Sequence, residues 1–200
     1  MKQDTFAKLE PGGYYHIYNR GNNKETIFKE PRNYDYFLSL WIKYIEPVAK
    51  NYCYSLLPNH FHFFIRVEKM DQPSPAAYIS QAFSNLFNAY AKAINRKYKR
   101  TGSLFQERFR RKEITSDAYF TEIIGYILTN SVKHGYGKTA LTYPYSAYKS
   151  LISDKPTRLL RNEVMQWFNG REAFIKYIES YEENILNRKL IMEKEDDDGG

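Results

Sequence analysis

The stretch from Pro58 to Val67 constrains the fold of this chain more than any other. From residue 60 onward the sequence has a period of two: one set of positions holds Phe61, Phe63, Ile65 and Val67, and the other holds His60, His62, Phe64 and Arg66. This period predicts a β-strand with one face on a core. His60 and His62 would then share a face and could contact one metal ion. Histidines buried for structural reasons are the alternative.

The flanking segments predict a sheet covered by helices. Strands are expected over residues 14–20, 51–57 and 60–67, and a fourth strand or extended arm over 103–114. Helices are expected over about 33–47, 75–98 and 117–134. This order is the βαββαβ plan followed by one more helix. We therefore predict an α+β fold: a ferredoxin-like antiparallel sheet with helices on one face, plus extra C-terminal helices.

The chain divides into three predicted parts. Residues 1–150 form the sheet domain, residues 151–190 form a C-terminal helical appendage, and residues 191–200 form a disordered acidic tail. Residues 143–153 are expected to be an irregular connection. Within the appendage, apolar periodicity predicts helices over about 159–168 and 171–187. The appendage carries no chemical signal of its own.

Cysteine content and hydropathy indicate a cytoplasmic protein. A lone cysteine, Cys53, cannot form an internal disulfide, which suits a reducing compartment. No apolar run approaches the roughly 18 residues of a membrane span, so no membrane partner is expected. The first five residues lack the apolar core of a signal peptide.

Charge favours a nucleic-acid partner. The formal net charge is +7, and the acidic tail means that the rest of the chain is more basic still. Aromatic residues make up 17% of the chain, and many alternate with Lys and Arg. Such a surface can neutralise phosphates and stack on unpaired bases. An aromatic core with a solvated basic face is the alternative.

The helix expected from Asp117 brings further polar groups beside its apolar face. Tyr126 and Asn130 are four residues apart, so they are neighbours on one helix edge, with Tyr119 and Lys133 in the same wedge. Two imidazoles, an amide oxygen and a phenol suit Mg²⁺ or Mn²⁺ better than a closed zinc site. Eighteen other tyrosines compete for any role given to Tyr126.

Four ordered motifs resemble one protein family. They are Tyr15–Gly21 (YHIYNRG), Leu57–His62 (LPNHFH), Thr101–Phe109 (TGSLFQERF) and Tyr126–Gly135 (YILTNSVKHG). The second resembles the signature of the HUH endonucleases, and the set resembles the single-tyrosine transposases of the REP-associated branch. The resemblance covers about residues 13–150.

The resemblance implies a metal-dependent endonuclease and strand transferase that cuts single-stranded DNA beside a hairpin. By motif match, Tyr126 is the nucleophile, and His60, His62 and Asn130 hold the metal. Cleavage in the family leaves a 5′-phosphotyrosyl link and a free 3′-hydroxyl, which later rejoins DNA. The chain departs from the family pattern at Leu128, where the family has His, and at Ser131, where it has Pro.

DNA contacts are predicted mainly from the basic and aromatic segment between residues 97 and 112, with weaker candidates after the first strand. Arg66 shares the histidine face and could hold phosphate or pair with an acid, whereas His16 is expected to be structural. The predicted DNA-binding residues are Asn19, Arg20, Asn22, Arg66, Arg100, Phe105, Arg108, Arg110, Arg111 and Lys133.

Two other functions remain open from the sequence. A domesticated relative could bind hairpin DNA while cleaving it weakly, and the change at residue 128 keeps this alternative alive. An RNA-binding ferredoxin-like domain would explain the charge and the aromatics but not the histidine pair. The sequence also leaves open whether the protein is a homodimer or a monomer.

Overall fold

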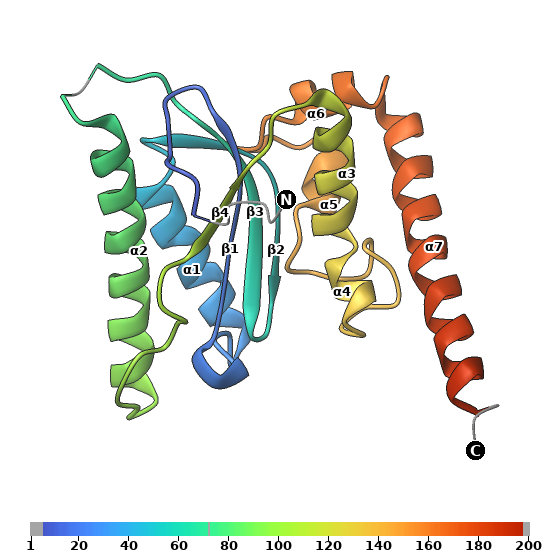
Figure 1. Cartoon of the computed structure of the whole chain (residues 1–200), viewed down its shortest axis with the longest axis horizontal. Helices are drawn as coiled ribbons and strands as arrows, with labels where there is room; N and C mark the ends of the chain where they lie inside the picture. The colour runs from blue at the N-terminus through green and yellow to red at the C-terminus, as the bar shows by residue number, and fades with distance from the viewer. Residues whose placement is uncertain (1–5, 72, 198–200) are drawn as a thin grey trace.

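Four antiparallel strands form the sheet at the centre of the molecule (Figure 1). The computed structural model describes residues 6–71 and 73–197, and for Asp117 and residues 188–197 it describes the backbone alone. The strands are β1 (Tyr14–Arg20), β2 (Ala49–Leu57), β3 (His60–Val67) and β4 (Arg110–Glu113), in the order β2-β3-β1-β4. This is the order of a ferredoxin-like sheet, and it confirms the predicted α+β fold.

Strand register places the histidine strand in the middle of the sheet. In the pairing of β1 with β3, Tyr18 lies opposite His62 and Arg20 lies opposite His60. The pairing of β2 with β3 contains an irregularity between Asn51 and Cys53. The fourth strand is shorter than the 103–114 segment predicted, because only residues 110–113 pair regularly with β1. The start of β3 therefore meets the end of β1.

Helices α1 (Pro31–Tyr44) and α2 (Pro75–Lys97) cover one face of the sheet (Figure 1). Each has a proline in its first turn, where the missing N–H has no helical partner to lose. The apolar positions of β3 point to these helices. Trp41 of α1 stacks on Phe63, with ring centroids 3.5 Å apart, and Phe37 contacts Phe61. This packing fixes which face of β3 carries the histidines.

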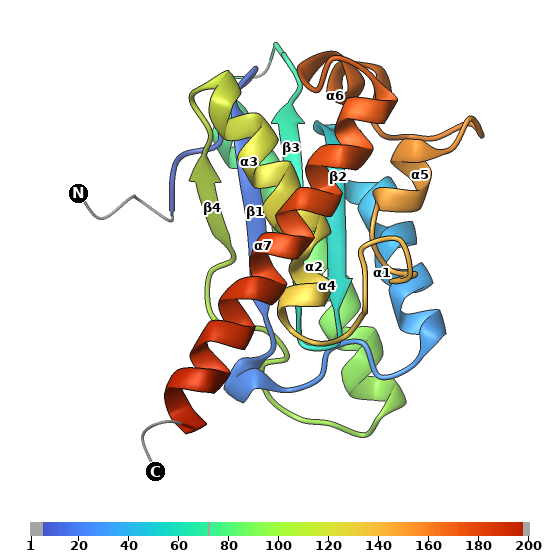
Figure 2. The same cartoon turned by 90° about the vertical axis from the view of Figure 1, so that its right-hand side faces the viewer.

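The remaining helices cover the opposite face (Figures 1 and 2). Phe64 packs there in a second core with Ile124, Ile127 and Leu128. No helix in the described residues is long and apolar enough to cross a membrane. The elements are α3 (Asp117–Leu128), α4 (Asn130–Lys133), α5 (Tyr148–Ile152), α6 (Arg161–Trp167) and α7 (Arg171–Asp197), and a short 3-10 turn, η1 (Asn22–Lys24), follows β1.

Three segments differ from the sequence prediction. The prediction of an irregular connection over residues 143–153 is wrong where α5 forms. This short helix forms because Tyr148 and Leu151 are buried in the second core. The helix predicted from Asp117 is divided at Thr129, whose hydroxyl donates to the Gly125 carbonyl at 2.8 Å. The tail predicted to be disordered over 191–200 is helical as far as Asp197, and residues 198–200 lie outside the described residues.

Helix α7 packs closely on α3 at Gly125, one residue before Tyr126. A Cβ at this position would lie 2.8 Å from a ring carbon of Tyr181 and 2.9 Å from one of Tyr177.

Alanine normally favours a helix over glycine, but the overlap with two rings should dominate. We expect Gly125→Ala to lower the free energy of unfolding by about 1–3 kcal/mol. Urea denaturation measures this change, and Ser39→Ala on α1, whose exposed hydroxyl donates to the carbonyl of Tyr36 within its own helix, should change it little. An equally stable Gly125→Ala protein would contradict the close packing.

Candidate active site

The start of β3, the end of α3 and the first residue of α4 bring together the four residues predicted to carry the chemistry. His60 Nε2 lies 3.2 Å from the side-chain oxygen of Asn130. The ring of Tyr126 stands edge-on to His62, with centroids 5.5 Å apart. His60, His62 and Tyr126 line a pocket of about 460 Å³, and the buried Asn130 lies behind His60. The residues that line the pocket are Tyr18, Asn19, Arg20, His60, His62, Gln106, Arg110, Tyr126 and His134.

A neighbouring amide sets the orientation of His60. Its Nδ1 lies 2.6 Å from Oδ1 of Asn59, in the turn between β2 and β3. Because an amide oxygen only accepts, Nδ1 of His60 donates the proton, and Nε2 keeps its lone pair. That lone pair faces the amide oxygen of Asn130. The turn itself is held by backbone bonds from Ile27 and Phe28 to the carbonyl of Pro58.

A third imidazole holds His62. Nε2 of His16, on β1, lies 2.9 Å from Nδ1 of His62, and both side chains are more than nine-tenths buried. The contact occupies Nδ1 of His62, so Nε2 is the nitrogen left for a metal. The register explains the contact, because His16 is a diagonal neighbour of His62 across the two strands.

Burial favours the neutral form of His16, His60 and His62. It lowers the pKa of His60 to about 4 and that of His16 to about 3, and it holds the pKa of His62 well below its usual value. The amide oxygen of Asn130 opposes this effect at His60 to a smaller extent, because it can accept a hydrogen bond only from a ring protonated at Nε2. Neutral imidazole is the form that binds a metal ion, so these side chains need lose no proton to act as ligands near pH 7.

Asn130 is the first residue of α4 and is fully buried. Its oxygen faces His60, but its Nδ2 has no partner among the described residues. The 3.2 Å between Asn130 Oδ1 and His60 Nε2 is close to the roughly 3 Å between adjacent ligands on an octahedral ion with ligands at about 2.1 Å. The described residues contain no cluster of three or more His, Cys, Asp or Glu side chains that could hold a metal. Any metal here would therefore need the amide of Asn130 beside the two imidazoles.

Some of the residues predicted to bind DNA lie at this pocket. Asn19, Arg20 and Arg110 line it, and Lys133 places its ammonium 5.2 Å from the centroid of the Tyr126 ring. Asn19 is largely buried and bonds to the carbonyl of Gln106 at 3.3 Å. It therefore helps to hold the segment before β4 against the end of β1.

Three other residues predicted to bind DNA instead contact residues of the protein away from the pocket. Arg66 pairs with Glu163 at 2.9 Å, near the far end of β3, as the alternative of an acidic partner predicted. Arg100 pairs with Glu25 at 2.6 Å. The expectation of an exposed ring at Phe105 is wrong, because this side chain is 7% exposed and packs against the core around Phe61 and Phe87.

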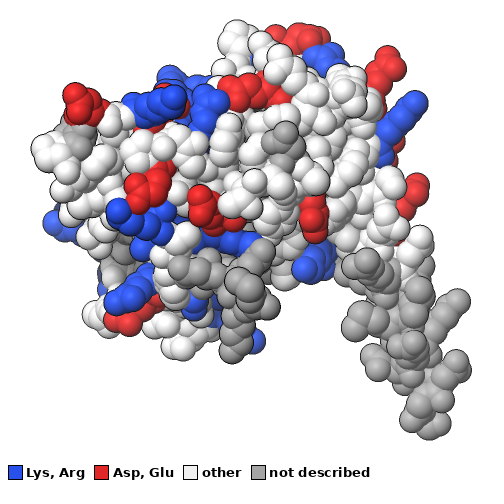
Figure 3. All heavy atoms as spheres, turned by 45° about the horizontal axis from the view of Figure 1, so that its top comes forward, with Lys and Arg blue, Asp and Glu red and all other residues white. Residues whose placement is uncertain are grey.

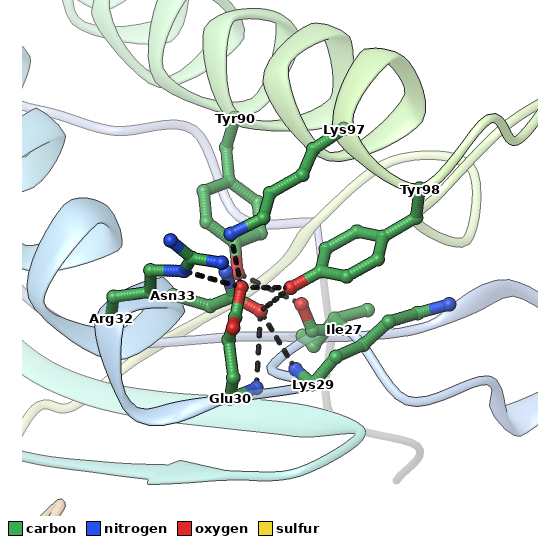
Figure 4. Close-up of polar contacts among 8 residues, drawn as sticks. All are labelled: Ile27, Lys29, Glu30, Arg32, Asn33, Tyr90, Lys97 and Tyr98. Carbon is green, nitrogen blue, oxygen red and sulfur yellow. Dashed lines mark hydrogen bonds and ion pairs between the residues drawn. The ribbon is translucent and has the colours of Figure 1, made fainter.

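The end of α2 that the sequence marked as basic and aromatic forms an internal network (Figure 4). Lys97, Tyr98 and Arg32 converge on the carboxylate of Glu30, just before α1. Hydrogen bonds from Arg32, then from Lys97 and Tyr98, lower the pKa of Glu30 to about 2. Together with the Arg100–Glu25 pair, this network ties the segment that follows β1 to α2.

The last three predicted contacts lie outside the pocket. Arg108 is exposed and Arg111 donates to the carbonyl of Ala7 at 2.6 Å, and both line a second hollow beside α2. Asn22 begins η1, with its backbone N–H bonded to the carbonyl of Leu104. On the face shown in Figure 3, Lys and Arg are mixed with Asp and Glu instead of forming one continuous basic field.

The sequence prediction missed several residues of the pocket. His16 was expected to be structural; it lies behind the pocket, and the sequence did not reveal that it bonds to His62. His134 ends α4 and faces His60, with ring centroids 4.8 Å apart. Its position four residues after Asn130 was a usable signal, because such residues are neighbours on a helix. Tyr18 and Gln106 lie in two of the motifs, but only the strand pairing brings them to His62.

Comparison with known proteins finds similarity both in sequence and in structure. No protein-family model matches the chain. A provisionally assigned REP-associated tyrosine transposase of Haemophilus influenzae is 29% identical over 98 residues, which are 46% of this chain and 55% of that protein. The chain therefore matches only about half the length of this relative.

The structure of a REP-associated tyrosine transposase bound to a REP hairpin superimposes with a TM-score of 0.62. It is 18% identical, and the match covers 75% of this chain and 86% of the solved chain. At that identity the match shows the fold. Sequence and fold thus confirm the resemblance carried by the four motifs: this chain is similar to REP-associated tyrosine transposases.

Proposed function

We propose that the protein is a metal-dependent single-strand DNA endonuclease and strand transferase that acts beside DNA hairpins, with Tyr126 as its nucleophile. The observation that carries the proposal is that Tyr126, His60 and His62 line one pocket, with the buried Asn130 oxygen 3.2 Å from Nε2 of His60. The similarity to transposases, one of them bound to a hairpin, supports hairpin DNA as the partner.

The donor set fits a divalent ion such as Mg²⁺ or Mn²⁺. Neutral imidazole nitrogens on His60 and His62 and the amide oxygen of Asn130 would hold it, and water or phosphate would complete its coordination. A bound ion would polarise a phosphate oxygen and offset the negative charge that develops at phosphorus. His16 and Asn59 would orient the two imidazoles through their Nδ1 atoms.

The phenol of Tyr126 carries out the covalent step. Its oxygen attacks the scissile phosphorus, the bond from phosphorus to the 3′ oxygen breaks, and the phenol proton departs while the 3′ oxygen gains one. The ammonium of Lys133, 5.2 Å from the centroid of the Tyr126 ring, is a cation that would attract the phosphate reacting there. In the reverse direction a 3′-hydroxyl attacks the phosphotyrosine and restores a DNA backbone. The bond energy is conserved, so no high-energy cofactor is needed.

The test is a denaturant-resistant adduct. A labelled oligonucleotide with a hairpin and single-stranded flanks is incubated with the protein and Mn²⁺, then separated in detergent. We expect a covalent protein–DNA band that a chelator prevents and that added Mn²⁺ restores. A salt-sensitive shift without any adduct would instead support a protein that only binds hairpins.

The change at residue 128 gives little support to that weaker function. Leu128 is fully buried in the second core and does not line the pocket. The departure from the family pattern at this position therefore falls in the packing of α3 and leaves the proposed ligands and nucleophile in place.

His16 gives a prediction about the metal site that does not involve a ligand. Replacing His16 by Phe keeps a ring in the strand but removes the hydrogen bond to His62. We expect about a tenfold or greater rise in the Mn²⁺ concentration needed for half-maximal adduct formation, with a near-normal rate at saturating Mn²⁺. Tyr18→Phe is the matched control, since the ring of Tyr18 stacks on the same two imidazoles and phenylalanine keeps that ring. An unchanged Mn²⁺ requirement in His16→Phe would contradict the orienting role.

A further inference from the structure

A separate pocket lies at the β2 edge of the sheet. It has a volume of about 510 Å³ and lies where α1 meets β2 and the segment 156–159, which follows α5. Figure 2 shows α1 and α5 beside β2, the edge strand. Asn51 lines this pocket and pairs with Ile65, whereas His60 pairs with Leu57 at the other end of β2. We call this hollow the β2-edge pocket, and it is distinct from the proposed active site.

Two buried polar atoms of the β2-edge pocket have no hydrogen-bond partner among the described residues. They are Nε1 of Trp41 and Oδ1 of Asn51, and both residues line the pocket while being only 1% and 7% exposed. The indole N–H can only donate, and the amide oxygen can only accept. Folded proteins leave few buried groups of this kind unpaired, because each loses its hydrogen bonds to water. A donor and an acceptor in one pocket therefore point to a ligand that carries both complementary groups.

The rest of the wall is mainly apolar. The Trp41 ring is held in place by its stacking on Phe63. Mostly apolar walls with a few fixed polar groups are typical of pockets that bind small molecules, and the volume lies in the usual range for them. The other apolar and aromatic residues that line the pocket are Leu38, Ile42, Tyr54 and Leu159.

Charge at the pocket favours an uncharged ligand. The exposed Arg158 donates to the carboxylate of Glu46 at 2.8 Å, and this ion pair joins the residues after α1 to the segment 156–159. Because the two lining charges offset each other, the pocket offers no net charge to a ligand.

The sheet edge beside the pocket is already occupied by the chain itself. The backbone N–H of Leu160 donates to the carbonyl of Asn51 at 2.8 Å, and that of Ala147 donates to the carbonyl of Tyr54 at 2.9 Å. An extended peptide from a partner would need such edge groups to add as a strand. The pocket therefore suits a small molecule and not a partner strand.

We propose that the β2-edge pocket binds a small, uncharged, largely apolar molecule through a secondary amide. The amide C=O would accept from Nε1 of Trp41, and its N–H would donate to Oδ1 of Asn51. A lactam, which presents both groups on one edge of a ring, is the simplest ligand of this class. This site goes beyond the proposed function and does not depend on it.

The test uses two matched pairs of probes. Full-length ¹⁵N-labelled protein is titrated with quinolin-2(1H)-one, a lactam, and with coumarin, in which an oxygen replaces the N–H. The smaller pair is δ-valerolactam and cyclohexanone. The chain has two tryptophans, so an NMR spectrum contains two indole N–H signals, and the one absent from Trp167→Phe belongs to Trp167.

We expect the lactams to shift the indole signal of Trp41 and to leave that of Trp167, which packs at the second core, unchanged. In each pair the lactam should bind about tenfold more tightly than its partner, because the partner leaves the buried oxygen of Asn51 unpaired. Asn51→Ala should abolish this preference. Asn162→Ala, at an exposed position of α6, is the matched control and should keep it.

Thermal unfolding checks that both asparagine variants are folded. If no probe moves the Trp41 signal at millimolar concentration, the two polar groups are satisfied by water alone and the proposal fails. Equal affinity of the lactams and their partners would show apolar binding without the amide contact and would also overturn it. A tenfold preference that survives in Asn51→Ala would exclude Asn51 as the acceptor and contradict the site as described.

Discussion

Replacing Tyr126 by Phe is expected to abolish the covalent adduct, a loss of at least about 10³-fold in the rate of DNA cleavage. Phenylalanine keeps the ring that stands against His62 but removes the oxygen that would attack phosphorus. Tyr126 is only partly buried and phenylalanine keeps its ring contacts, so the variant should fold and bind hairpin DNA normally. Gel separation in detergent measures the adduct, and anisotropy with the same oligonucleotide measures binding.

Tyr18 supplies the control for this experiment. Its ring also lines the pocket, 5.7 Å from that of His62, so it is the rival nucleophile within the same site. We expect Tyr18→Phe to retain the adduct. If Tyr18→Phe loses the adduct while Tyr126→Phe retains it, the nucleophile lies on β1, and the part assigned to α3 is wrong.

The elements of the fold could be predicted because local pattern and tertiary burial agree. The two-residue period of β3 assigned Phe61 and Phe63 to one core and His62 to the other face, as the packing of Trp41 on Phe63 confirms. Proline and capping signals marked the starts of α1 and α2 closely. No such signal marks α5, since its five residues are helical only because the core around them buries Tyr148 and Leu151.

The proposed ligands could be named from motif and spacing, but their surroundings could not. The role of His16 depends on the register of β1 against β3, which a single strand sequence does not contain. The exposure of Phe105 and the ion pairs of Arg66 and Arg100 depend on contacts with residues 40 or more positions away. A run of basic and aromatic residues predicts a nucleic-acid surface, but folding uses several of its members to hold α2 to the rest of the chain.

Asn130 allows the proposed metal site to be tested apart from the nucleophile. Asn130→Ala removes the amide oxygen 3.2 Å from His60 and should raise the Mn²⁺ requirement for adduct formation by about 100-fold, since it would delete a ligand and not merely a neighbour of one. Asn130→Asp keeps an oxygen at nearly the same place and adds a negative charge, so this variant should bind Mn²⁺ at least as well as the wild type.

The paired variants also separate a ligand from a structural residue. Because Asn130 is fully buried, Ala at this position should lower stability as well, which thermal unfolding without metal records. A structural role alone would lower stability and leave the Mn²⁺ requirement unchanged. A ligand role predicts that added Mn²⁺ restores the adduct in Asn130→Ala and raises the unfolding temperature of the wild type and of Asn130→Asp more than that of Asn130→Ala. Identical Mn²⁺ titrations for all three proteins would show that Asn130 is not a metal ligand. The buried amide, whose Nδ2 has no partner among the described residues, would then lack the function proposed for it.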